Sequence, residues 1–335
     1  MLSRTVRRTP TVVMALAVTT ALVACVPGTP PAQPGPGPGS PDPTLGGCPM
    51  MPADSYWHAD VRGLQVDPSS AAWVSNIGGS SHVHADFGSG LWDGGPIGIP
   101  YTTVGAGQPK VPITFGYDAD SDPGPYPFPW NAPIEGGATS GGDRHVLVVD
   151  NSTCLLYETW DSHPGSSPAA AWYAGSGAVF DLRSNALRQA GLTSADAAGL
   201  PMLPGLVRYD EVAAGTVDHA IRITVPRTRN SFVWPARHQA SSSGDASRPP
   251  MGAWLRLKAS VDTAGLSHDA RVIAEAMRTH GVIVADNGSS WYISGAPDER
   301  WNNDVLHELD RIVGSDFEAV NAAPLMVDPN SGQVR

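Results

Sequence analysis

Charged residues and cysteines are both scarce in this sequence. Lys, Arg, Asp and Glu make up only 16% of the 335 residues, and 32 acidic residues outnumber 21 basic ones, which gives a formal net charge of −11. Such an acidic chain is a poor match for a nucleic-acid binder, whose affinity depends on neutralising phosphates with Lys and Arg. The three cysteines show no Cys-x-x-Cys spacing, which argues against a zinc site built from cysteines.

Several short catalytic motifs are also missing. The sequence contains no Gly-x-Ser-x-Gly nucleophile elbow, no phosphate-binding loop and no dinucleotide fingerprint. His307-Glu308 begins a metalloprotease-like pair, but no second histidine follows at the required position. We therefore expect His307 and Glu308 to face solvent.

Glycine, proline and tryptophan are abundant instead. The chain has 37 glycines, 32 prolines and ten tryptophans, and 41% of its residues are hydrophobic. The many turns argue against a helical bundle, and the hydrophobic content argues against disorder. We predict a mainly β fold: a single large β-sandwich or barrel-like domain over residues 46–335, with long Gly/Pro loops and two C-terminal helices.

Short segments rich in β-branched and aromatic residues predict the strands. The expected strands are residues 112–117, 145–150, 154–160, 219–225, 231–234, 254–258, 282–285 and 291–293. Turn residues predict two hairpins, the first between 145–150 and 154–160 and the second between 282–285 and 291–293. Amphipathic spacing predicts the two helices, at 267–280 and 303–313, each followed by a glycine.

The first 24 residues have the pattern of a signal peptide. A basic start containing Arg4, Arg7 and Arg8 precedes an uncharged, largely apolar stretch from Thr11 to Ala24. At about 1.5 Å per residue, this stretch would extend only about 21 Å, too little for a bilayer core of about 30 Å. That length is typical of an export signal.

The end of this segment, Leu22-Val23-Ala24-Cys25, resembles the lipobox of bacterial lipoproteins. The resemblance implies cleavage before Cys25 and a diacylglycerol on its thiol, followed by a Pro/Gly-rich tether over residues 25–45. We then expect an exported protein whose partner is the membrane, held by the lipid on Cys25 at the extracytoplasmic face of the cell membrane. An ordinary secretory signal with an incidental cysteine is the alternative.

The remaining cysteines, Cys48 and Cys154, are a plausible disulfide in an exported protein. Two buried thiols are the alternative. The domain resembles a group of secreted bacterial proteins of unassigned activity in four stretches: residues 84–88, 142–150, 204–210 and 284–288. This resemblance supplies no mechanism, so the chemistry rests on the residues themselves.

The first predicted hairpin carries the main catalytic candidates. If Asn151 and Ser152 form a two-residue loop, His145 lies directly opposite Glu158, with Cβ atoms about 5 Å apart. A carboxylate raises the pKa of a neighbouring histidine and fixes its tautomer, which suits proton transfer. A cross-strand polar pair that only closes the sheet is the alternative.

Further candidates lie beside the predicted strands. Asp143 and Arg144 precede the first strand of this hairpin and complete the expected catalytic set. Aromatic, Arg, His and acidic side chains at a sheet rim suit a sugar ligand. The expected substrate-binding residues are Trp160, Trp234, Arg237, His238, Tyr209 and Asp210.

A third group offers metal ligands. On an extended strand, His82, His84 and Asp86 all point to one face, with ligand types suited to Zn²⁺ or Fe²⁺. The His-x-Asp part is similar to one portion of the two-His-one-carboxylate site of non-haem iron oxygenases. A polar loop without metal is the alternative.

The composition and these candidates predict a surface lipoprotein that acts on an extracellular polysaccharide as a hydrolase or a lyase. A non-catalytic glycan-binding or envelope-structural lipoprotein is the first alternative. A metal-dependent oxidoreductase is the second. No nucleic-acid partner is expected, and no cofactor beyond the metal just considered.

Overall fold

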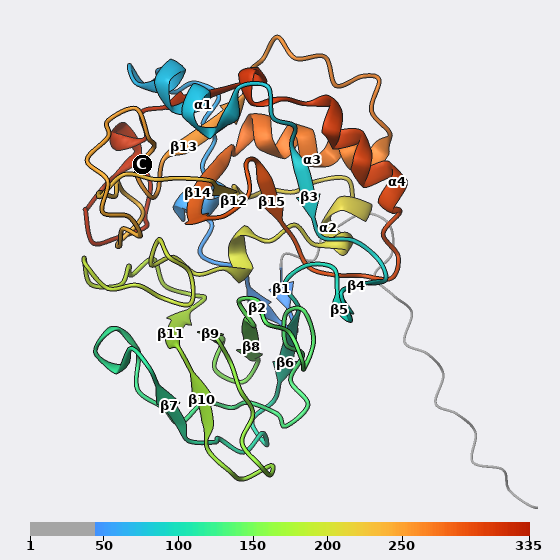
Figure 1. The fold of residues 1–335 in the computed structure, drawn as a ribbon, viewed down its shortest axis with the longest axis vertical. Helices are drawn as coiled ribbons and strands as arrows, with labels where there is room; N and C mark the ends of the chain where they lie inside the picture. Colours follow the sequence, from blue (N-terminus) through green and yellow to red (C-terminus); the bar gives the residue numbers. More distant parts are fainter. Residues whose placement is uncertain (1–43) are drawn as a thin grey trace, which may run out of the picture. The chain divides into compact units, whose positions relative to one another are not determined.

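Strands outnumber helices along the part of the chain that the structure, a computed structural model, describes (Figure 1). The described residues are 44–335, so the predicted signal peptide, Cys25 and almost all of the tether lie outside them. The predicted mainly β fold is confirmed. None of the helices within the described residues is long and apolar enough to cross a membrane.

Most strands belong to two large sheets. The six-stranded sheet has the order β16-β13-β14-β12-β15-β3, and the four-stranded sheet has the order β11-β9-β8-β6. The first contains β3 (His84–Asp86), β12 (Ile221–Val225), β13 (Trp254–Leu257), β14 (Val282–Asn287), β15 (Tyr292–Ser294) and β16 (Phe317–Val320). The second contains β6 (Tyr101–Val104), β8 (Val146–Asp150), β9 (Leu155–Trp160) and β11 (Ser176–Asp181). Within residues 44–335 both sheets keep two edge strands, so neither closes into a barrel.

Three short strand pairs and the helices complete the fold. The pairs are β1 (Thr44–Leu45) with β2 (Cys48–Pro49), β4 (Leu91–Trp92) with β5 (Gly95–Pro96), and β7 (Ile113–Phe115) with β10 (Trp172–Ala174). The α-helices are α1 (Ser70–Gly78), α2 (Tyr209–Ala213), α3 (His268–Thr279) and α4 (Asn303–Leu306). The 3₁₀ helices are η1 (Tyr56–His58), η2 (Asp118–Asp120), η3 (Leu203–Gly205), η4 (His307–Arg311), η5 (Gly314–Asp316) and η6 (Ala323–Leu325).

The two predicted C-terminal helices have different outcomes. The first is confirmed as α3, whose apolar face is buried. The second is α-helical only in its first turn, α4, and continues as the 3₁₀ helix η4. Leu306, Leu309 and Ile312 are all buried, and their spacing of three residues matches the period of a 3₁₀ helix, in which residues i and i+3 share one side.

The second predicted hairpin is wrong. Strands β14 and β15 exist, but β12 lies between them, parallel to β14 and antiparallel to β15. The turn residues between β14 and β15 therefore connect strands that are not neighbours. The predicted strand at 231–234 contributes only an isolated bridge between Phe232 and Met251.

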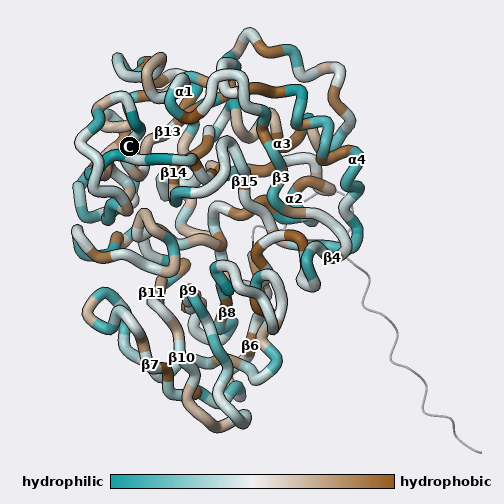
Figure 2. Tube along the Cα trace, viewed as in Figure 1, coloured by the Kyte–Doolittle hydropathy of each residue, from teal (hydrophilic) through white to brown (hydrophobic). Residues whose placement is uncertain are grey.

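The four-stranded sheet is covered on both faces. Val146 and Val148 of β8 belong to a small aromatic-rich core, whereas Leu147 and Val149 belong to the large core shared with the six-stranded sheet. Because alternate residues of β8 face these two cores, every residue of the strand is buried. The hydrophobic run of β8 and the hydrophobic residues of α3 are visible in Figure 2. His145 lies two residues before Leu147, and Glu158 is paired with Leu147 across the two strands, so both side chains lie on the face of the large core.

The disulfide between Cys48 and Cys154 is confirmed. It joins β2, at the start of the described chain, to the turn between β8 and β9. This link closes a loop with a sequence separation of 106 residues.

Candidate functional site

The first hairpin forms, but its register differs from the prediction. Val146 pairs with Thr159 and Leu147 pairs with Glu158, so the turn has four residues rather than two. Cys154 closes this turn with a φ of +54° and donates its N–H to the Asp150 carbonyl. The two-residue shift keeps His145 and Glu158 on one face but removes them from opposite positions. The predicted direct His145–Glu158 pair is therefore wrong.

His145 binds another carboxylate. Its Nδ1 lies 2.5 Å from Oε2 of Glu135, and its Nε2 lies 3.2 Å from the Ala195 carbonyl oxygen. Both ring nitrogens face acceptors, so the doubly protonated ring can donate to both. Burial lowers the pKa of His145, but the charge and hydrogen bond of Glu135 outweigh it and raise the pKa to about 9. His145 is therefore a buried cation at neutral pH.

Glu158 is bound to the backbone instead. Its carboxylate accepts the N–H groups of Met202 and Leu203 at 2.9–3.0 Å, where η3 begins. The residue is fully buried, and this burial outweighs the two N–H donors and raises the pKa of Glu158 to about 7. Glu158 therefore connects β9 to the chain entering η3 and makes no direct contact with a cation.

The two residues before β8 have different environments. Arg144 is buried with a φ of +53°, and its guanidinium donates to the carbonyl oxygens of Ser162, Ala138 and Ser140. This binding satisfies the Arg144 charge with loop backbone, which is a structural role and does not support the predicted catalytic one. Asp143 is exposed and accepts the indole N–H of Trp160 at 3.1 Å.

Arg222 on β12 forms the centre of a second polar group that the sequence did not single out. Its guanidinium binds both oxygens of Asp196, at 2.9 and 3.0 Å, and donates to the Ser294 hydroxyl at 2.8 Å. Asp286 on β14 lies 3.5 Å from the same guanidinium. Ser294 pairs across β15 and β3 with Asp86, so a polar row crosses three strands of the six-stranded sheet.

These two polar groups influence one another through the space between the sheets. The Arg222 charge favours the ionised forms of Glu135, Asp86 and Asp286, and the His145 charge favours those of Glu135, Glu158 and Asp286. For Asp86, Glu158 and Asp286, burial outweighs this effect, so the pKa is raised overall. We call this set the acidic cluster. Its members are Asp86, Glu135, His145, Glu158, Asp196, Arg222 and Asp286.

Three carboxyl groups of the acidic cluster retain contact with solvent. The side chains of Glu135 and Asp286 are 26% and 25% exposed, and Asp86 is exposed at the end of β3. Burial and the neighbouring Asp196 charge raise the pKa of Asp286 to about 6. Partial loss of hydration also raises the pKa of Asp86, whereas His145 overcomes the effect of burial and lowers the pKa of Glu135. The solvent edge of the cluster therefore holds two carboxyl groups that bind protons more tightly than usual.

Sequence reasoning missed Glu135, Asp196, Arg222 and Asp286. An available signal was Arg222 itself, a charged residue within the apolar strand sequence Ile-Arg-Ile-Thr-Val. An arginine on a buried strand requires a carboxylate partner. The identity of that partner depended on a loop that contributes Asp196, which no local pattern marks.

Three of the predicted substrate-binding residues have structural contacts with loop backbone. Trp234 donates its indole N–H to the Ser331 carbonyl, and His238 Nδ1 lies 2.9 Å from the Ala197 carbonyl. The buried guanidinium of Arg237 binds three oxygens, those of the carbonyls of Arg188 and Pro329 and of the Asn330 side chain. The indole N–H of Trp234, the Arg237 guanidinium and Nδ1 of His238 thus all bind the protein itself, so the predicted role of these residues in binding sugar lacks support.

Two more of the six predicted substrate-binding residues, Tyr209 and Asp210, lie on α2 and contact a different segment, whereas the sixth, Trp160, binds Asp143. The guanidinium of Arg300 lies 4.3 Å from the ring centroid of Tyr209 and 2.7 Å from Asp210. Tyr209 and Asp210 are therefore engaged by Arg300.

The predicted metal ligands do not come together as a set. His82 uses its Nδ1 to bind the Asp310 carbonyl oxygen, and Asp86 belongs to the acidic cluster. His84 instead lies beside His307 and the Asp310 carboxylate. The prediction that His82, His84 and Asp86 form one site is wrong, because η4 packs beside β3 and supplies different neighbours.

An aromatic surface lies next to Asp143. The Trp160 ring is 6.3 Å from that of Tyr117, and the Tyr173 ring is 5.8 Å from the His163 ring, which binds Asp161. Gly175, two residues after Tyr173, packs against the Trp160 ring so closely that a Cβ at Gly175 would lie within 2.4 Å of that ring. We call Tyr117, Trp160, His163 and Tyr173 the aromatic surface.

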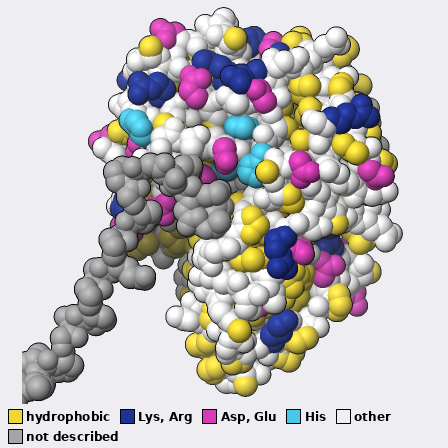
Figure 3. Space-filling view, turned by 180° about the vertical axis from the view of Figure 1, so that it is seen from behind, with side chains coloured by type: hydrophobic (Ala, Val, Ile, Leu, Met, Phe, Trp, Pro, Cys, Tyr) yellow, Lys and Arg dark blue, Asp and Glu magenta, His cyan; other side chains and the backbone are white. Residues whose placement is uncertain are grey.

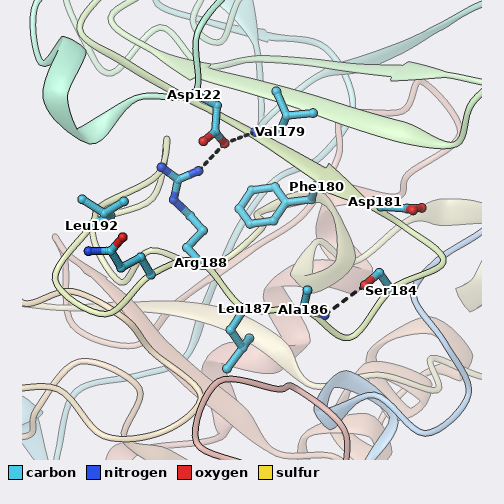
Figure 4. A pocket seen from close by; sticks show the side chains of 10 residues that line it. Asp122, Val179, Phe180, Asp181, Ser184, Ala186, Leu187, Arg188 and Leu192 are labelled. Carbon is cyan, nitrogen blue, oxygen red and sulfur yellow. Dashed lines mark hydrogen bonds and ion pairs between the residues drawn. The ribbon is translucent and has the colours of Figure 1, made fainter.

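A separate recess of about 320 Å³ lies between β11 and the loop that follows it (Figure 4). Arg188 points into it and forms an ion pair with Asp122, which also accepts the Val179 N–H at 2.8 Å. The recess charges are thus paired, and none of its lining residues belongs to the acidic cluster. On the face shown in Figure 3, Lys and Arg form small separate groups, several of them beside Asp or Glu.

Comparison with known proteins adds no further information: no family model, curated protein or solved structure matches this chain.

Proposed function

We propose that this protein is an exported lipoprotein, anchored through Cys25, that hydrolyses a neutral extracellular polysaccharide. The anchoring part rests on the lipobox-like Leu22–Cys25 sequence. The hydrolytic part rests on one observation, the presence of Asp86 and Asp286 at the solvent edge of the acidic cluster with raised pKa values.

The charges of the acidic cluster are unevenly paired. His145 is bound by Glu135 and Arg222 is bound on two sides by Asp196. Asp286 receives only a longer contact from Arg222, at 3.5 Å. The two cations are thus already engaged, and Asp86 and Asp286 remain available for proton transfer.

Hydrolysis of a glycosidic bond needs two carboxyl groups in different protonation states. Asp286, with a pKa of about 6, is suited to hold a proton and give it to the leaving glycosidic oxygen. Asp86, when ionised, takes a proton from the water that attacks the sugar. One water is added across the bond, and the two carboxyl groups exchange their protonation states.

The charge balance favours a neutral substrate and a hydrolase over a lyase. Five carboxyl groups surround two cations in the acidic cluster, so a uronic acid would be repelled. A lyase also needs a cation to neutralise the substrate carboxylate, and Arg222 is already bound to Asp196. The aromatic surface offers rings on which sugar faces stack.

A second candidate is glycan binding without catalysis. It is favoured by the aromatic surface, in which the Tyr117 and Tyr173 rings are exposed, Trp160 binds Asp143 and His163 binds Asp161. The two candidates differ in whether the acidic cluster or the aromatic surface is essential.

One experiment separates them. The full-length protein is incubated with xylan, mixed-linkage glucan, galactomannan and, as an anionic comparison, pectin, and new reducing ends and retained binding are both measured. We expect Asp286→Asn to lower hydrolysis of a neutral polysaccharide by about 10²–10⁴-fold, while the exposed control Glu299→Gln leaves it unchanged. Hydrolysis that survives Asp286→Asn would refute the catalytic assignment.

The aromatic arm uses Tyr173→Ala with Trp92→Ala as its control. Trp92 is exposed on β4, outside the aromatic surface. Loss of binding only in Tyr173→Ala, with no product from the wild-type protein, would support the second candidate over the first.

A further inference from the structure

Three side chains with metal-binding atoms meet where β3 packs beside η4 (Figure 1). One ligand atom from each of His84, His307 and Asp310 lies within 4.8 Å of the other two. His307 Nδ1 is 3.6 Å from a carboxylate oxygen of Asp310, and the two imidazole ring centroids are 6.1 Å apart. These residues come from chain segments more than two hundred residues apart.

The local structure fixes this arrangement from both sides. His307 and Asp310 are three residues apart on η4, and residues i and i+3 of a 3₁₀ helix project from the same side. Backbone contacts hold β3 beside them, because Val83 donates its N–H to the Ile312 carbonyl at 2.9 Å and His82 binds the Asp310 carbonyl.

The His84 ring is positioned by its own strand neighbour. It packs on Tyr292 of β15, with ring centroids 4.4 Å apart, and the two residues are paired in the parallel ladder. The His84 ring therefore packs against the Tyr292 ring and also lies close to His307 and Asp310 of η4.

We propose that His84, His307 and Asp310 form a divalent metal site that takes Zn²⁺. Two imidazoles and one carboxylate are ligands that Zn²⁺ prefers, and three protein ligands leave a fourth position for water. Two imidazole nitrogens argue against Ca²⁺ and Mg²⁺, which take oxygen ligands.

The required adjustment is small and falls on exposed side chains. Ligand atoms of a tetrahedral zinc site lie about 3.3 Å apart, given Zn–N and Zn–O distances of about 2.0–2.2 Å. The side chains of His307 and Asp310 are 60% and 44% exposed, so they can close around an ion without disturbing the core.

This site is independent of the proposed hydrolase. None of its ligands belongs to the acidic cluster, although His84 lies two residues before Asp86 on β3. Bound Zn²⁺ would tie the edge strand of the six-stranded sheet to η4 and so raise the thermal stability of the protein.

The test is calorimetric titration of the tag-free, chelator-treated full-length protein with ZnCl₂, together with Co²⁺ titration followed by visible absorption. We expect one ion per chain, a tetrahedral Co²⁺ spectrum, and a rise in Tm of about 3–6 °C at a hundredfold excess over Kd. His307→Ala and His84→Gln should each weaken Zn²⁺ binding by about 100-fold or more.

His163→Gln is the matched control, because His163 also binds an exposed aspartate, Asp161, without a third ligand nearby. It should bind Zn²⁺ like the wild type. A wild-type protein that binds no Zn²⁺, or equal binding by wild type and His307→Ala, would overturn the proposal. Because His307 is exposed, an unchanged metal-free Tm of His307→Ala shows that this variant is folded.

Discussion

The buried ion pair between His145 and Glu135 makes a quantitative prediction about stability and pH. The pKa of His145 is raised from 6.5 to about 9, so folding favours the protonated ring. Because a tenfold change in proton affinity corresponds to 1.36 kcal/mol, this shift contributes about 3 kcal/mol to the free energy of unfolding. The contribution is fully present below pH 6.5 and is lost as the pH rises through 9.

A double-mutant cycle measures the interaction between His145 and Glu135 separately from other effects of each substitution. We expect His145→Gln to destabilise the protein by about 3–5 kcal/mol at pH 6, because Glu135 and the Ala195 carbonyl lose their partner. The coupling energy between His145→Gln and Glu135→Gln should be about 2–3 kcal/mol, somewhat less than the full shift, because Glu135 is partly exposed and water replaces part of the contact.

The assay is urea unfolding of the wild type, both single variants and the double variant at pH 6, 7.5 and 10. The coupling should fall towards zero at pH 10, where the His145 ring is neutral. The exposed pair His163–Asp161 is the control, and its coupling should be close to zero at all three pH values. A His145–Glu135 coupling that is equal at pH 6 and pH 10 would refute an ionic pair.

Three other outcomes are expected. Replacing Cys48 and Cys154 by serine should lower the free energy of unfolding by about 4–5 kcal/mol, because the disulfide restricts a long loop in the unfolded chain; an unchanged urea midpoint would contradict this. Arg222→Met should destabilise by about 3–5 kcal/mol by leaving Asp196 buried without its cation, and adding Asp196→Asn should recover part of the loss in the same urea assay. Cys25→Ala should release the protein from the membrane fraction on cell fractionation, and unchanged partitioning would count against the lipid anchor.

Several features follow from the sequence by itself, because their causes are local. The alternation and β-branched content of residues 145–160 predict β8 and β9, and the apolar spacing of 267–280 predicts α3. If Cys25 carries the lipid, Cys48 and Cys154 are the two cysteines that remain, and export favours a disulfide between them over two buried thiols. In each case the determining residues are neighbours along the chain or have no competing partner.

The partners of the buried charges are decided by the tertiary structure. The turn after β8 has two more residues than the prediction, so Glu158 lies opposite Leu147, and a loop brings Glu135 to His145. The insertion of β12 between β14 and β15 likewise sets Arg222 beside Ser294.

The same reason explains the separation of the predicted metal ligands. His84 and Asp86 share a strand face, but the metal-binding atoms that gather with those of His84 come from His307 and Asp310, on a helix from the other end of the chain. Periodicity specifies which face of an element a side chain occupies, whereas the order of strands and the packing of loops determine what lies across from that face. A buried charge is stabilised by whatever lies across from it, so its partner is known only once the chain is folded.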